Sequence, residues 1–131
     1  MKDETRAAPA RNRFKSRGGL QRIAAATRYS WSGLRAALRH EAAFRQELAL
    51  GLPMLLLAPW LAPSRGALVA MVASVVLVWI VELLNSGIEA VADAVTEEAH
   101  PLIGRAKDFG SAAVMLSLVL VVAVWTLLLW P

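Results

Sequence analysis

The sequence contains no cysteine, which excludes disulfide bonds, cysteine-ligated metal sites and thiol catalysis together. It holds only two histidines, His40 and His100, which are too few and too far apart in the chain for a zinc site. Neither a Gly-x-x-x-x-Gly-Lys-Ser/Thr loop nor a kinase-type glycine loop occurs, so the common phosphate-binding loops are excluded. No segment before residue 20 has the apolar core of a secretory signal, so we expect any membrane insertion to depend on later segments.

Long apolar runs are what the sequence does contain. Of its 131 residues, 57% are hydrophobic, and residues 66–81 and 111–131 hold no charged side chain. A helix of about 20 apolar residues spans the hydrocarbon core of a bilayer. A third run, residues 48–62, is shorter, and residues 42–44 extend it. These runs predict an all-α membrane protein with transmembrane helices at about 41–62, 66–94 and 107–130. Pro53 and Pro59 leave open a re-entrant alternative for the first of them.

The positive charge is distributed unevenly along the chain. Eleven of the fourteen Lys and Arg residues precede residue 46, and Arg105 and Lys107 lie in the second connection. By the positive-inside rule, the N-terminus and this connection are predicted to be cytoplasmic, and the C-terminus outside. The net charge of +4 is concentrated beside a membrane helix. We therefore expect attraction to anionic lipid, and no nucleic-acid partner.

The basic N-terminal third divides into a tail and a helix. Residues 1–19 are polar and aperiodic, which predicts a disordered tail. From Leu20 to about residue 39, apolar side chains that include Trp31 recur on one face of a helical wheel with arginines beside them. This pattern is typical of an amphipathic helix that lies on a membrane surface. Its arginines are interpreted as contacts either to lipid headgroups or to phosphate.

The second apolar run continues into a polar helical face. Glu82, Asn85, Ser86, Glu89 and Asp93 follow a spacing of i, i+3, i+4, i+7 and i+11, which puts all five on one side of a helix. If the helix begins near residue 67, Glu82 lies about 22 Å along it, still within the hydrocarbon layer. Desolvation makes a carboxylate a stronger base, so Glu82 is a candidate general base. Glu89 lies in a wetter place and is a candidate cation ligand.

Charged residues on the other two predicted spans converge on the same level. Glu41, Arg45 and Glu47 open the first span, and Lys107 and Asp108 open the third. Paired carboxylates beside cationic side chains suit Mg²⁺ and polyphosphate. Structural alternatives also exist: Arg45 with Glu47, or Lys107 with Asp108, are possible ion pairs at helix ends. Asp93 is interpreted as a solvated surface residue without a partner.

At this point the sequence resembles a known family, the bacterial integral-membrane diacylglycerol kinases. Four motifs carry the resemblance in the family's order, at residues 29–37, 41–47, 80–91 and 104–113. The resemblance implies an ATP-dependent kinase of the bacterial inner membrane that phosphorylates diacylglycerol to phosphatidic acid. It also implies a homotrimeric helical bundle with sites between neighbouring subunits.

The resemblance also assigns roles to residues. Glu82 is expected to accept the proton of the lipid hydroxyl, with Asn85 positioning the reacting groups, and Glu41 and Glu89 are expected to hold Mg²⁺ on ATP. The remaining nucleotide contacts are expected at Arg22, Tyr29, Glu98, His100, Lys107 and Asp108. The lipid side is expected to include Trp31, Arg35, Ala43, Phe44, Arg45, Glu47, Ser111 and Trp125. The chain departs from the family pattern at Ala25, Arg28 and Ala99, beside the expected nucleotide contacts.

Three rival hypotheses remain from the sequence. A polyprenol kinase of the same superfamily would share the glutamates and phosphorylate a different lipid alcohol. A proton or cation pathway would also place acids in a membrane helix. An assembly subunit of a larger complex would need no chemistry at Glu82. The most useful single experiment is transfer of labelled γ-phosphate to a panel of lipid alcohols, which separates the two kinases from each other and from the non-enzymatic hypotheses.

Overall fold

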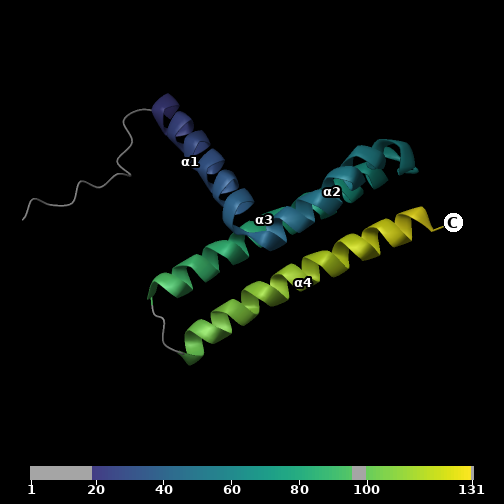
Figure 1. The fold of residues 1–131 in the computed structure, drawn as a ribbon. Coiled ribbons are helices and arrows are strands. Elements are labelled where there is room, and N and C mark those ends of the chain that lie inside the picture. The colour runs from purple at the N-terminus through teal and green to yellow at the C-terminus, as the bar shows by residue number, and fades with distance from the viewer. Residues whose placement is uncertain (1–18, 96–99, 131) are drawn as a thin grey trace, which may run out of the picture. The chain divides into compact units, whose positions relative to one another are not determined.

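The computed structural model describes residues 19–95 and 100–130, and all regular structure in these ranges is α-helical. The helices are α1 (Gly19–His40), α2 (Ala42–Leu61), α3 (Arg65–Val95) and α4 (Pro101–Leu129) (Figure 1). The predicted all-α class is therefore confirmed. The disordered tail predicted for residues 1–19 lies, except for Gly19, outside the described residues.

The chain divides into two compact units between Leu34 and Arg35. In the first unit, residues 19–34 form the larger part of α1, and both its basic and its apolar side chains are exposed. Leu20, Ile23 and Trp31 are among these exposed apolar side chains. A helix with an uncovered apolar face is the form expected of a membrane-surface helix. The second unit holds the end of α1 and the three helices that follow.

Helix α2 continues through both of its prolines. Pro53 and Pro59 lie inside the single helix Ala42–Leu61, so this segment is one continuous helix of 20 residues. A short turn then leads into α3, where the Ser64 Oγ accepts a hydrogen bond from the Ala67 backbone N–H at 3.1 Å. This serine is a typical N-cap, and it explains why α3 begins at Arg65.

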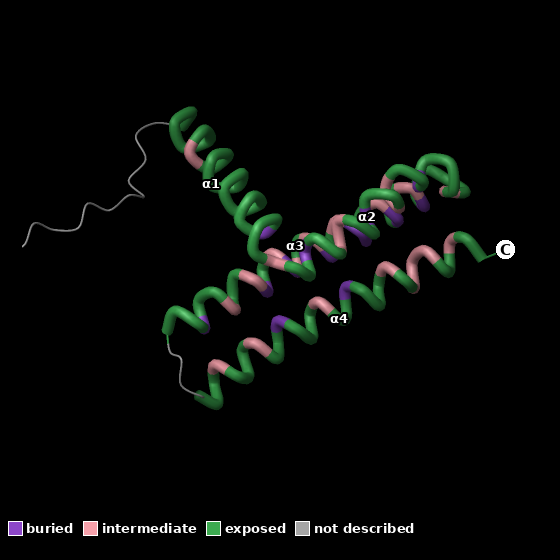
Figure 2. The backbone as a smooth tube through the Cα atoms, in the orientation of Figure 1, coloured by how far each residue is buried: buried purple, intermediate pink, exposed green. Residues whose placement is uncertain are grey.

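Helix α3 is central in the second unit because it packs against both α2 and α4. On α4, buried and half-buried positions recur at alternating intervals of four and three residues, along the side that faces α3 (Figure 2). This is the heptad pattern of helices that cross at about 20°. The positions that follow this spacing are Ile103, Lys107, Gly110, Val114, Ser117, Val121, Val124 and Leu128, and Ala123 and Trp125 are half-buried beside them.

Helix α4 begins at Pro101, earlier than the span predicted from residue 107. The His100 Nδ1 accepts a hydrogen bond from the Leu102 backbone N–H at 3.3 Å, and Pro101 follows at the first helical position. A capping side chain and an N-terminal proline both favour helix initiation. Lys107 and Asp108 therefore lie inside the helix, about two turns from its start, whereas the prediction followed only the apolar run.

The surface of the second unit is apolar and its interior partly polar. Many leucine and valine side chains of α2, α3 and α4 are exposed, while Ser74, Glu82, Asn85 and Ser117 are buried. Helices α3 and α4 are long and apolar enough to cross a membrane. Helix α2 is less apolar than these two helices, because Arg45, Gln46 and Glu47 are polar residues in its first turns.

Candidate functional site

The polar face predicted on α3 is graded in burial. Glu82 and Asn85 are buried, with 4% and 9% of their surface exposed, Ser86 and Glu89 are half-buried, and Asp93 is exposed. This order of burial agrees with the prediction that Glu82 is the most desolvated of the three acids Glu82, Glu89 and Asp93. An ionised carboxylate with so little exposure is energetically costly unless neighbouring groups compensate for it.

The Asn85 amide links the buried and the half-buried parts of this face. Its Nδ2 donates a hydrogen bond to the Glu89 Oε1 at 3.1 Å, one helical turn away. Its Oδ1 is buried and has no hydrogen-bond partner among the described residues. A buried unpaired oxygen in a polar site is a candidate ligand contact, because such atoms are normally satisfied.

Three other carboxylates lie within electrostatic reach of Glu82. Glu82 is close enough to Glu41, Glu47 and Glu89 for their charges to interact with it. Of the four acids, two come from α3, one from α2, and Glu41 is the residue that precedes α2. No cationic side chain in the described ranges forms an ion pair with any of the four. The arrangement has an excess of negative charge that a cation would relieve.

Lys107 pairs with Asp93 instead of with its sequence neighbour. The Lys107 Nζ lies 2.8 Å from the Asp93 Oδ1, which joins α4 to the end of α3. The interpretation of Asp93 as a residue without a partner was therefore wrong, although its side chain is 72% exposed. The alternative of a Lys107–Asp108 pair is also not what forms, and Asp108 is exposed.

The Arg45 side chain caps the C-terminal end of α1. Its Nη1 donates to the backbone carbonyls of Leu38 and Arg39, at 3.3 and 3.4 Å. These carbonyls belong to the last turn of α1, where backbone acceptors lack intrahelical donors. The alternative of an Arg45–Glu47 ion pair is thus not observed, and the Glu47 Oε2 is buried without a partner in the described part of the chain.

An apolar groove of about 510 Å³ lies between α2, α3 and α4, and Glu47 is the one charged residue in its lining. Its walls include Trp79 of α3 and Trp125 of α4. The Trp125 Nε1 donates to the Met71 carbonyl at 3.3 Å, which holds α4 against α3 beside the groove. Such a groove, apolar with few polar groups, is typical of sites for apolar ligands.

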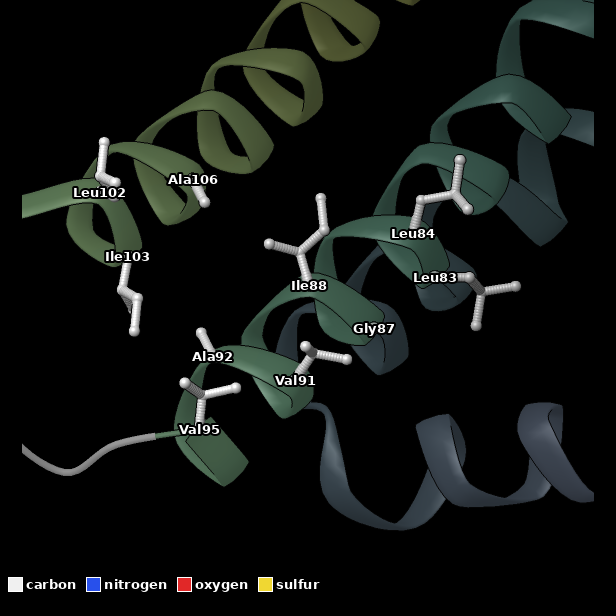
Figure 3. A pocket seen from close by; sticks show the side chains of 10 residues that line it. All are labelled: Leu83, Leu84, Gly87, Ile88, Val91, Ala92, Val95, Leu102, Ile103 and Ala106. Carbon is white, nitrogen blue, oxygen red and sulfur yellow. The ribbon is translucent and has the colours of Figure 1, made fainter. Parts of the chain in front are cut away.

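A second groove, of about 560 Å³, lies near the connection between α3 and α4 (Figure 3). It is lined only by apolar side chains and Gly87, from residues 83–95 of α3 and 102–106 of α4. Leu84, Ile88 and Ala106 are among the side chains drawn in the close-up. Because no polar side chain lines this groove, it contains no candidate catalytic residue.

The other predicted site residues are only partly brought together. Phe44 is buried and Trp125 half-buried, while Arg35, Ala43 and Ser111 are exposed. Arg22, Tyr29 and Trp31 are exposed on the first unit, and His100 caps α4. Glu98 lies outside the described residues. Across the described ranges, no three His, Asp or Glu side chains are grouped as a metal site.

Sequence reasoning missed the two glycines that control how closely the helices approach. Gly51 of α2 faces Trp79, and Gly110 of α4 faces the Asn85 side chain. The available signal was the occurrence of glycine inside a helical pattern, which usually has a packing or functional reason. That signal shows that a glycine matters, but it does not show which side chain of the neighbouring helix the glycine contacts.

Comparison with known proteins places these features in a family. Residues 28–129 match the family described as prokaryotic diacylglycerol kinase. The chain is 51% identical to the diacylglycerol kinase of Escherichia coli K12 over 112 residues, which cover 86% of this chain and 92% of that protein. Identity to the diacylglycerol kinase of Pseudomonas aeruginosa is 47% over 116 residues, 88% of this chain and 94% of the relative. The chain belongs to the prokaryotic diacylglycerol kinase family.

Proposed function

We propose that this protein is a membrane-bound lipid kinase that transfers the γ-phosphoryl group of ATP to the free hydroxyl of diacylglycerol, giving phosphatidic acid. The observation that carries the proposal is the buried Glu82, within electrostatic reach of Glu47 at the edge of an apolar groove. A proton acceptor next to an apolar binding surface is what a lipid alcohol requires. The names of the similar proteins support the same reaction.

In this proposal Glu82 accepts the proton of the lipid hydroxyl while the hydroxyl oxygen attacks the γ-phosphorus. A bond forms between that oxygen and phosphorus, the bond from the γ-phosphorus to the bridging oxygen breaks, and ADP leaves. General-base catalysis of this kind typically contributes about 10²–10⁴-fold to a rate. Asn85 is proposed to position the reacting groups by holding Glu89 through its Nδ2.

Glu41 and Glu89 are proposed to hold Mg²⁺ with the ATP phosphates. The fit rests on the donor set: carboxylate oxygens are the ligands Mg²⁺ prefers, and the cluster around Glu82 lacks a cationic partner in the described ranges. When bound, the ion supplies charge neutralisation on the phosphates. Two protein carboxylates are enough, because Mg²⁺ commonly keeps waters and substrate phosphates as its other ligands.

The remaining residues are proposed to bind the two substrates. Lys107, released from Asp93, would offer its ammonium group to phosphate, as a point charge commonly does. The other proposed nucleotide contacts are Arg22, Tyr29, Glu98, His100 and Asp108. The proposed lipid contacts are Trp31, Arg35, Ala43, Phe44, Arg45, Glu47, Ser111 and Trp125.

We further propose that α2, α3 and α4 all cross the bacterial inner membrane, with the N-terminus cytoplasmic and the C-terminus outside. Arg45 and Glu47 then lie at the cytoplasmic end of α2, where their long side chains can reach the interface. The apolar outer surface of the three helices would face lipid and, in a homotrimer, neighbouring subunits.

Transfer of labelled γ-phosphate to a panel of lipid alcohols tests the proposed reaction. Purified protein with MgATP should label diacylglycerol, and a faster rate with undecaprenol would assign it to a polyprenol kinase instead. ATP consumption that remains zero with every lipid would favour a proton or cation pathway. Protein carrying Glu82→Gln, assayed in parallel, controls for contaminating kinases.

A further inference from the structure

Gly110 lies in the interior of α4, is buried, and faces the Asn85 side chain of α3. A methyl group at its Cα would overlap the Asn85 Oδ1 and lie 3.2 Å from the Asn85 Cγ. Glycine is less favourable than alanine inside a helix, so an alanine here would be expected to improve the helix if the space allowed it. The space is taken by the amide.

The contact fixes the orientation of the Asn85 amide from both ends. At one end, Nδ2 donates to the Glu89 Oε1 at 3.1 Å. At the other end, Oδ1 is buried and faces Gly110, where a Cα hydrogen is a weak donor. Turning the amide over would put Oδ1 against the Glu89 carboxylate, which repels it. The Glu89 carboxylate thus selects the orientation of the amide, and the glycine leaves the space that the amide occupies.

We propose that Gly110 is a positioning residue for the kinase reaction: it leaves room for the Asn85 amide in the place where its Nδ2 orients Glu89. The inference rests on the roles proposed above for Asn85 and Glu89. It adds α4 to the elements that determine the geometry of the site. Lys107 lies one turn away on the same face of α4. The helix that carries the proposed phosphate contact therefore also determines the position of the Asn85 amide.

The chain offers a matched control on the same helix. Gly104 also lies in α4, and a methyl group there would meet nothing within 4 Å. Gly110→Ala should lower kcat on the order of 100-fold, the loss that a displacement of about 1 Å causes in a catalytic site. The KM values for diacylglycerol and MgATP should change far less. Gly104→Ala should keep the original kcat, and equal kcat values for the two variants would overturn the proposal.

A double-mutant cycle separates positioning from a general packing defect. Asn85→Ala removes the amide and leaves room for a methyl group, so adding Gly110→Ala to it should cause no further loss of kcat and should not impair folding. Losses that multiply would mean that the two residues act independently, which contradicts the proposal. Loss of kcat in Asn85→Ala with full kcat in Gly110→Ala overturns the positioning role alone. Full kcat in both overturns the proposed role of Asn85 on which it rests.

Nuclear magnetic resonance gives a readout that does not depend on activity. The sequence holds two asparagines, Asn12 and Asn85, so protein labelled with ¹⁵N at the asparagine side-chain amides gives two side-chain nitrogen signals, each with a pair of protons. Asn85→Ala in the same labelling identifies which signal belongs to Asn85. Gly110→Ala should shift that signal, as Glu89→Gln should, and Gly104→Ala should not. An Asn85 signal unmoved by Gly110→Ala would overturn the proposal.

Discussion

Glu82 and Glu89 lie two turns apart on one face of α3, and they differ in their surroundings. Glu82 is buried among other acids, whereas Glu89 is half-buried and accepts a hydrogen bond from Asn85. The buried acid suits proton transfer, and the more accessible one suits a cation that arrives with ATP. The same residue type is therefore proposed for two roles, separated by position along a single helix.

Glu89→Gln tests the cation role. The substitution keeps the size of the side chain and removes one anionic ligand, so we expect the Mg²⁺ concentration for half-maximal activity to rise about tenfold or more. A Mg²⁺ titration of kinase activity at saturating ATP measures it. An unaltered titration in Glu89→Gln would remove Glu89 from the proposed metal site.

At the residue scale, helical spacing was enough to predict the polar face and the burial of Glu82. Spacing could not predict which residues on other helices meet that face. The Lys107–Asp93 pair joins positions far apart in sequence, and Arg45 contacts backbone carbonyls that no side-chain pattern reveals. Both contacts depend on how the helices cross, which one sequence does not state.

At the scale of the elements, small residues allow the helices to approach closely. Gly51 of α2 is buried, and a methyl group there would lie 2.8 Å from the Trp79 Cζ2 and 2.9 Å from the Val75 Cγ1. Small residues at helix contacts are the usual means of close packing in membranes, where burial of apolar surface gives little drive. Gly51 therefore sets the distance between α2 and α3 next to the groove.

Gly51→Ala should destabilise the packing of α2 on α3. Overpacking typically costs about 1–3 kcal/mol, and we expect a loss of that size in the free energy of unfolding relative to Gly87→Ala. Gly87 is the matched control because a methyl group there meets nothing within 4 Å. Unfolding in a denaturing detergent, followed by circular dichroism, measures both variants. Equal stability of the two would show that Trp79 and Val75 move aside without cost.

The helix bounds show what local sequence signals can achieve. Proline, glycine and serine between α2 and α3 predicted that turn, and the structure begins α3 at Arg65, beside the predicted start. The start of α4 differed because the apolar run begins later than the helix. His100 and Pro101 carry the signal for helix initiation. Because neither residue is apolar, a prediction from the apolar run alone does not include them in the helix.

At the scale of the whole molecule, charge and apolarity divide the chain. Most of the positive charge precedes residue 46, and most of the exposed large apolar side chains belong to the helices that follow. The distribution of charged and apolar residues along the sequence was enough to predict this division and the membrane class. It gives no information on how subunits meet, because an apolar surface suits lipid and protein equally well.

Cysteine accessibility tests the proposed topology, and the absence of native cysteine makes it simple to read. With three spans, Ser64→Cys in the turn between α2 and α3 should react with a membrane-impermeant maleimide in intact spheroplasts. Ala94→Cys near the end of α3 should react only after lysis. If α3 and α4 alone crossed the membrane with a cytoplasmic N-terminus, the two results would be reversed.

The central claim is that Glu82 is the base of a lipid kinase, and Glu82→Gln tests it most directly. The variant keeps the shape of the side chain and every proposed metal ligand. We expect the transfer of labelled γ-phosphate to diacylglycerol to fall on the order of 10²–10⁴-fold while the Kd for MgATP stays within about twofold of the original. Phosphoryl transfer at the original rate, or an equal loss of MgATP binding, would contradict the account.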